Sequence, residues 1–263
     1  MRITNLGTSH GDPTPEHFCS STLLETGGRL YLVDCGEPAN ALLVRRGFCA
    51  SQLSAIFVTH MHIDHTGSLP VLCEQAAKYR RRFPDVRLSV LLPEAAAFDG
   101  LVAWREANHS GRFDNRAEHD GGAPVFGDVR AYDDTHGYDD GTLAMTAVRT
   151  DHLAHLHNPD VCAFSLKFSC EGKRVLFTGD LAADFHDFPL DAAQGCDLVF
   201  SEITHYPLEK AIPTLERLQA GRLVFYHIGD PWQPADRQRL ALDMCRHLPF
   251  PVSFAHDGCV TTL

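Results

Sequence analysis

The sequence predicts a mixed α/β chain in which two β-sheets pack face to face and helices cover the outside. Strand-like runs dominate residues 2–33 and 125–178, and helical patterns are inserted in each half of the chain. Sheets with one face on a shared core need helices on the other face, which favours this four-layer arrangement. With 263 residues we expect a single domain, residues 1–263, that can bury a substantial core.

In the first half, β-rich runs predict strands and periodic apolar spacing predicts helices. Gly27-Gly28 is a hairpin turn between two strands. Leu72, Ala76, Tyr79 and Phe83 recur at helical spacing after the Ser68-Leu69-Pro70 start. The predicted strands are 2–6, 22–26, 30–33, 55–58 and 87–92, and the predicted helices are 38–47, 69–83 and 93–108.

The second half begins after a polar, Gly-rich stretch at 109–124, which predicts a loop. A functional lid and a loop without a role are both open. The remaining predicted strands are 125–132, 143–150, 162–169, 174–178, 198–201, 223–226 and 252–255, with helices at 208–219 and 234–247.

The composition excludes several classes of partner. Lys plus Arg number 23 against 34 Asp plus Glu, a net charge of −11, which argues against binding to nucleic acid or anionic membranes. No apolar run approaches the ~20 residues of a membrane span, and the N-terminus lacks a secretory pattern. The nine cysteines contain no C-x-x-C pair, which predicts free thiols in a reducing compartment. We therefore expect a cytoplasmic protein.

The most informative segment is Thr59-His60-Met61-His62-Ile63-Asp64-His65-Thr66-Gly67. It follows the apolar run 55–58, so a buried strand ends in three imidazoles and a carboxylate. Such groups are costly at a buried strand end unless something satisfies them. Neutral imidazole and carboxylate are the usual ligands of zinc and neighbouring metals. On extended backbone His60, His62 and Asp64 would share one side and His65 would face away, which suggests two ligand sets and two metals.

Other apolar strands also end in metal-type residues. The run 175–178 stops at Gly179-Asp180, and the run 223–226 stops at His227. His152, His155 and His157 precede the strand at 162–169. Alone, Asp180 could be a turn residue and His227 a satisfied strand-end histidine. Together with the first cluster they supply what a closed two-metal site needs.

These motifs make the chain resemble the metallo-β-lactamase superfamily over nearly its whole length. The resemblance rests on Leu6-Gly7-Thr8, 32–36 (LVDCG), 59–70 (THxHxDHxxGxLP, with Gly67 inside the motif), 177–180 (FTGD), 197–202 (DLxxSE) and 226–228 (YHI). It implies an αββα sandwich with the metals at one edge between the sheets.

The resemblance also implies a ligand set for two divalent ions, zinc in the first instance, with manganese or iron also compatible with these ligands. The first ion would take His60, His62 and a histidine from 152–157; the second would take Asp64, His65 and His227; Asp180 would bridge them. His157 is preferred as the third histidine because it stands seven residues before Phe164. His152 is the rival because Thr150-Asp151-His152 also looks like the usual lead-in. Asp34 would orient a ligating imidazole.

The Asp180 bridge looks like the phosphodiesterase, ribonuclease Z and glyoxalase II branches, and the opening at residues 6–13 (LGTSHGDP) looks like the ribonuclease Z and phosphodiesterase side. Unlike true ribonuclease Z, the chain lacks a long basic arm, and Glu16-His17 stands where an Arg would be expected. The resemblance therefore implies a hydrolase of a small phosphodiester or related ester. Asp64 would hold the attacking water and receive its proton, and His205 would donate a proton to the leaving oxygen.

Other functions of the same fold stay open at this point. They are thioester or lactone hydrolysis, a mononuclear iron dioxygenase acting on a persulfide, and a non-enzymatic sensor. One iron with oxygen uptake would separate the dioxygenase from a two-metal hydrolase, and a sensor would be expected to have a damaged ligand set. The expected partner is a small-molecule substrate, with nucleic acid and membrane not expected. The oligomeric state is open, a homodimer included.

Overall fold

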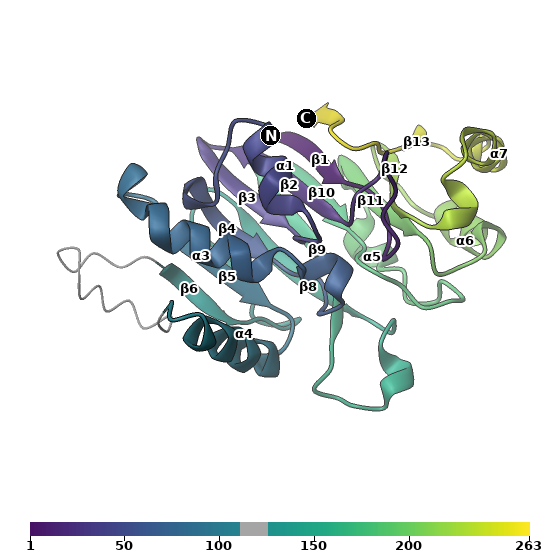
Figure 1. Cartoon of the computed structure of the whole chain (residues 1–263). Coiled ribbons are helices and arrows are strands. Elements are labelled where there is room, and N and C mark those ends of the chain that lie inside the picture. The colour runs from purple at the N-terminus through teal and green to yellow at the C-terminus, as the bar shows by residue number, and fades with distance from the viewer. Residues whose placement is uncertain (111–125) are drawn as a thin grey trace.

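The computed structural model describes residues 1–110 and 126–263, so the loop or lid predicted at 109–124 lies almost entirely outside the described residues. Two seven-stranded sheets face each other, in the orders β14-β1-β2-β3-β4-β5-β6 and β13-β12-β11-β10-β9-β8-β7. Helices lie along the outer face of each sheet, with α3 and α4 on one side of the molecule and α6 and α7 on the other (Figure 1). The predicted αββα sandwich is confirmed.

The elements follow the chain in this order. The strands of the first sheet are β1 (Arg2–Gly7), β2 (Ser21–Thr26), β3 (Arg29–Val33), β4 (Leu53–Phe57), β5 (Leu88–Leu92), β6 (Phe126–Ala131) and β14 (Val260–Thr262). Those of the second are β7 (Tyr138–Asp139), β8 (Ala144–Thr150), β9 (Ala163–Cys170), β10 (Lys173–Phe177), β11 (Leu198–Ile203), β12 (Leu223–Ile228) and β13 (Val252–Phe254). The helices are α1 (Ala39–Arg45), α2 (Ile63–Thr66), α3 (Leu69–Tyr79), α4 (Ala95–Ala107), α5 (Leu190–Ala193), α6 (Leu208–Leu215) and α7 (Ala235–Cys245).

The central strands are buried on both faces, which explains their nearly continuous apolar sequences. Along β4, Ala55 and Phe57 face the core between the sheets, whereas Ile56 faces the core under the first set of helices. Along β10, Phe177 faces the same central core and Leu176 the core beneath the second set. The strand period of two therefore places alternate side chains in separate apolar layers.

Parallel strands bring the polar strand ends together. β3, β4 and β5 are parallel neighbours in the first sheet, and β10, β11, β12 and β13 are parallel in the second. The carboxyl ends of parallel strands lie at one edge of a sheet, where ligand-binding loops collect. The two edges are joined directly, because the Phe164 N–H donates to the carbonyl oxygen of Thr59 at 3.0 Å.

Some element predictions differ from the structure for local reasons. The segment expected to be extended through Asp64 instead turns into the short helix α2, so Asp64 and His65 lie on helical rather than alternating backbone. The helix predicted at 208–219 ends at Leu215, two residues after the internal Pro213, which removes a helical hydrogen bond. β14 was not predicted, because a three-residue edge strand leaves almost no periodic signal.

Two compositional expectations can be compared with the structure. All nine cysteines are free thiols, six of them buried. In the described part of the chain, no helix combines the length and the apolarity that a membrane crossing requires.

Candidate metal centre

Eight of the histidines and carboxylates converge at the common edge of the two sheets. Among the described residues, three overlapping groups have potential ligand atoms within 4.8 Å of one another. The first group is His60, His62, His152 and Asp180; the second is Asp64, His65 and His227; the third is Asp180, His205 and His227. All seven residues other than His152 were predicted as site residues from the sequence.

The first sheet supplies its residues through the loop after β4. His60 is fully buried, and α2 then carries Asp64 and His65. Asp34, just after β3, accepts hydrogen bonds from the Thr59 backbone N–H and hydroxyl and holds His65 Nδ1 at 2.8 Å. One buried carboxylate therefore fixes both the loop and one imidazole.

The second sheet supplies its residues through two backbone irregularities. Gly179 has a φ of +58°, and a Cβ there would lie 2.6 Å from the Phe164 carbonyl oxygen, so only glycine lets the chain turn Asp180 inward. His227 has a φ of +48° and is the extra residue where the pairing of β12 with β11 shifts register. Such a bulge redirects a side chain out of the sheet, and here it turns His227 toward Asp180.

Several of the imidazoles have an Nδ1 partner and leave Nε2 facing the cluster, and His65, His227 and His152 are examples. His65 Nδ1 meets Asp34, His227 Nδ1 meets the Ser20 hydroxyl at 2.8 Å, and His152 Nδ1 meets the Leu181 carbonyl oxygen at 3.4 Å. A hydrogen bond at one ring nitrogen sets the tautomer and frees the other nitrogen to ligate a metal.

The donor atoms of this cluster have the chemistry and the spacing that a divalent metal ion requires. His60 Nε2, His65 Nε2 and Asp180 Oδ1 are buried and have no hydrogen-bond partner within the described residues. Buried polar atoms normally have a hydrogen-bond partner, so three such atoms without a partner in one cluster need an explanation. Ligand atoms about 2.0–2.1 Å from one tetrahedral zinc lie about 3.3 Å apart. His60 Nε2 is 3.4 Å from Asp180 Oδ2, whereas His65 Nε2 and His227 Nε2 are 3.4 and 3.3 Å from Asp180 Oδ1.

The two oxygens of Asp180 thus face different histidine groups. Oδ2 faces His60 and also His152, whose Nε2 is 3.6 Å away, and Oδ1 faces His65 and His227. A carboxylate placed in this way offers one oxygen to each of the two histidine groups. The His/Asp cluster is therefore of the kind that binds divalent metal.

The electrostatics of the cluster favour the ligating forms of His60 and Asp180 but the protonated form of His65. Burial, and next the neighbouring His65, hold the pKa of His60 well below its usual value, so this ring is neutral. Burial would raise the pKa of Asp180, but the adjacent His227, His65 and His60 outweigh it and keep the carboxylate ionised. Burial lowers the pKa of His65, yet Asp180 and Asp34 raise it well above the usual range. A metal must displace that proton, so metal affinity should fall with decreasing pH.

The structure places His152 in the cluster, and not His157, which the sequence had favoured as the third histidine. His157 is exposed and follows the 3₁₀ turn Ala154–Leu156 with a φ of +50°, outside all three groups found among the described residues. His152 occupies that position, with its ring 5.1 Å from that of His62. The reason is that β8 ends at Thr150, whose hydroxyl donates to the Asp180 carbonyl oxygen at 3.0 Å. Two residues later His152 places its Nε2 3.6 Å from Asp180 Oδ2, whereas His157 lies on the exposed turn beyond it.

We expect His152→Ala to weaken one metal site and His157→Ala to leave metal binding unchanged. Removing an indirect partner of a ligand already costs about 10–100-fold in metal affinity, and removing a ligand should cost at least as much. Competition with a chromophoric chelator measures the affinity of each variant. The exposed His157 is the matched control for loss of an imidazole, and the opposite pattern would restore the original assignment.

His205 lies beside the cluster and depends on a carboxylate that the sequence reading did not single out. Glu202 is fully buried in β11; its Oε1 holds His205 Nδ1 at 2.9 Å and accepts the Leu181 N–H, and its Oε2 accepts the Thr204 N–H. Burial lowers the pKa of His205, but the hydrogen bond and charge of Glu202 outweigh it and raise the pKa to about 9. His205 Nε2, 3.7 Å from Asp180 Oδ2, therefore carries a proton at the site. The available signal for Glu202 was a charged residue inside an apolar strand.

Comparisons with known proteins show what the chain is similar to. The chain is 29% identical to a ribonuclease Z of Mycolicibacterium paratuberculosis over 191 residues, which is 68% of this chain and 62% of the relative. The chain thus spans less than two thirds of that relative.

Two solved structures share the fold. One is the metallo-β-lactamase fold protein YhfI from Bacillus subtilis, with a TM-score of 0.74, 18% identity and 99% of each chain covered. The other is human tRNase Z, short form (ELAC1), with a TM-score of 0.71, 21% identity, and 100% of this chain and 99% of the other covered. These matches show that the chain has the metallo-β-lactamase fold and is similar in sequence to a ribonuclease Z, as the sequence motifs implied.

A more specific match comes from a protein-family model. The model described as the anti-Pycsar protein Apyc1 matches residues 1–247, which is nearly the whole chain. The matched residues include the H-x-H-x-D-H loop at 60–65, Asp180 and His227. The chain belongs to the family of the anti-Pycsar protein Apyc1.

Proposed function

We propose that the protein is a dinuclear metal-dependent hydrolase of a small phosphodiester. The observation that carries the proposal is Asp180, whose two oxygens face two separate histidine groups. The first ion would take His60, His62, His152 and Asp180, and the second would take Asp64, His65, His227 and Asp180. Zinc suits this set of imidazole and carboxylate ligands, and manganese or iron are compatible with it.

The ions would supply Lewis acidity toward a phosphoryl oxygen and a water with a lowered pKa. The chain's own residues would do the rest. Asp64 Oδ2 lies 3.6 Å from His65 Nε2 and 3.9 Å from His227 Nε2, so it is placed to orient an attacking water and to receive its proton. His205, held by Glu202 with a proton on Nε2, is placed to protonate the departing oxygen.

The charge of the chain supports a small substrate over a structured RNA. The similarity to ribonuclease Z makes RNA the second candidate, because cleavage of either substrate breaks a phosphodiester. A protein that grasps a polyanion neutralises phosphates with Lys and Arg, and here acidic residues exceed basic residues by 34 to 23. A small diester needs no such surface.

The test of this function combines metal analysis with a substrate screen. The purified protein should contain two ions per chain and should turn over bis-p-nitrophenyl phosphate faster than a thioester, a lactone or a precursor tRNA. A single iron with oxygen uptake would favour the persulfide dioxygenase. Two ions with turnover of only the thioester or the lactone would keep the dinuclear site but reject the phosphodiester.

We expect His205→Ala to slow hydrolysis in a way that depends on the leaving group. A diester with an alkyl leaving group needs a proton on the departing oxygen and should lose at least about 100-fold in kcat/KM. Bis-p-nitrophenyl phosphate releases a stable phenolate without a proton and should lose much less. Equal losses on both substrates, at unchanged metal content, would show that His205 has a structural role and does not protonate the leaving oxygen.

A further inference from the structure

The His227 ring is held by a hydroxyl that belongs to the opposite sheet. Ser20 immediately precedes β2, is 1% exposed, and places Oγ 2.8 Å from His227 Nδ1, across 207 residues of sequence. The same Oγ donates its proton to the Ser9 carbonyl oxygen at 3.1 Å. A hydroxyl has one proton to give. With that proton committed to Ser9, Ser20 can only accept a proton from His227 Nδ1.

Ser20 is fixed in this position from several sides. Its carbonyl oxygen accepts the Gly36 N–H at 3.0 Å, and a Cβ at Gly36 would lie 1.9 Å from the Asp64 carbonyl oxygen. Gly36 thus packs directly on the motif loop while it holds Ser20. On the other side, the Ser9 N–H donates to the Phe18 carbonyl oxygen at 2.7 Å, which closes the loop between the two serines.

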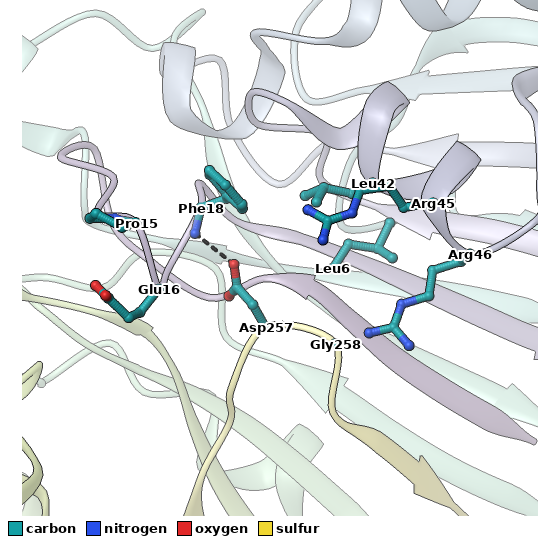
Figure 2. Close-up of a pocket in the computed structure, with 9 residues that line it drawn as sticks. All are labelled: Leu6, Pro15, Glu16, Phe18, Leu42, Arg45, Arg46, Asp257 and Gly258. Atoms are coloured by element: carbon teal, nitrogen blue, oxygen red, sulfur yellow. Dashed lines mark hydrogen bonds between the residues drawn. The ribbon is translucent and has the colours of Figure 1, made fainter.

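The far end of this loop is held by the carboxylate of Asp257. Figure 2 shows the Asp257 side chain directed at the backbone of Phe18, whose N–H donates to Oδ2 at 2.7 Å. Oδ1 accepts the Thr8 hydroxyl at 2.7 Å. The segment 8–20 is therefore tied at both ends, and the position of the Ser20 hydroxyl does not depend on His227.

We propose that Ser20 is a positioning residue for the metal centre. Its hydroxyl accepts a hydrogen bond from His227 Nδ1–H and fixes the ring so that Nε2 faces Asp180 and Asp64. Ser20 thereby controls the affinity of the second ion alone. This inference rests on the proposed dinuclear site. Three of the histidine ligands then have different outer partners. His65 has the carboxylate of Asp34, His152 has the Leu181 carbonyl, and His227 has a neutral hydroxyl.

The choice of partner has a chemical consequence. A carboxylate acceptor raises the basicity of the ring it holds more than a hydroxyl does, and a more basic ring is a stronger ligand. His227 is thus the adjustable ligand of the second site. The bulged backbone, with a φ of +48°, turns His227 toward Asp180, and the contact with Ser20 then sets the rotation of the ring.

The experiment compares Ser20→Ala with Ser21→Ala by chelator competition with zinc. Ser21 is also buried, and its Oγ has no hydrogen-bond partner in the described ranges, so it controls for loss of a buried hydroxyl. In Ser20→Ala one ion should bind about 10–100-fold more weakly while the other keeps its parental affinity. Ser20→Thr retains the hydroxyl and should restore the parental affinity of the site that Ser20→Ala weakens. Parental affinity for both ions in Ser20→Ala, or equal weakening of both, would overturn the inference.

A second readout needs neither a variant nor a bound metal. Nitrogen-15 NMR of the His227 ring in metal-depleted parent protein, above neutral pH, should find the proton on Nδ1. A proton only on Nε2 would overturn the inference. If the parent binds a single ion, the dinuclear function fails, and the ring protonation alone then decides whether Ser20 acts on His227. The two failures are therefore distinguishable.

Discussion

Asp180→Ala should remove both metals together and abolish hydrolysis. The reason is geometric: Oδ2 faces His60 and His152, and Oδ1 faces His65 and His227, so one truncation takes a ligand from each group. The substitution also removes the negative charge that lies among several closely spaced imidazoles of the cluster. We expect both affinities to fall by more than about 100-fold, beyond the cost of losing an indirect partner.

Metal content by mass spectrometry after gel filtration measures this result. Asp184→Ala is a matched control, because Asp184 lies in the loop after Asp180 but is exposed and pairs with His186 instead of the cluster. The control should retain both ions. Loss of only one ion in Asp180→Ala would show that the carboxylate does not bridge, and retention of both would remove it from the site.

Asp64→Asn should separate metal binding from catalysis. An asparagine oxygen can still occupy a ligand position, but it cannot receive a proton from an attacking water. We therefore expect turnover of bis-p-nitrophenyl phosphate to fall by at least about 100-fold when the variant is fully loaded with metal, the scale for loss of a positioned base. Single-turnover rates at saturating zinc measure the effect on the chemical step.

Two other outcomes for Asp64→Asn would change the role assigned to Asp64. Near-parental rates at full occupancy would make Asp64 only a ligand. A variant that never reaches two ions would show that the carboxylate charge is needed for binding, and the rate comparison would then be made at equal occupancy with the parent.

The parts of this site that follow from local sequence were predictable. The β4 strand is a short apolar run that ends in the H-x-H-x-D-H loop, so the loop and its chemistry are encoded within a few residues. The same holds for Gly179-Asp180 and for His227, since each ends an apolar strand. A buried strand that stops at a metal-type residue is a signal that needs no knowledge of distant contacts.

The third histidine was not predictable in the same way. Three histidines lie within residues 152–157, and spacing to the next strand favoured His157. The choice depends on the Thr150 hydroxyl bonding to the Asp180 carbonyl, a contact between segments 30 residues apart. Ser20 is a stronger case, because nothing near it in the sequence indicates that its partner is His227.

The division of ligands between two sheets also determines when during folding the centre can form. The first sheet alone offers His60, His62, Asp64 and His65, and the bridging Asp180 arrives only with the second. Capture of two ions by the complete ligand set therefore requires that the two sheets have docked. Ions bound only to the docked form oppose its separation, by about 2.7 kcal/mol when the free metal is 100 times its dissociation constant. The metal centre thus links the two sheets. The supply of metal should therefore affect the rate at which the folded chain unfolds as well as its rate of hydrolysis.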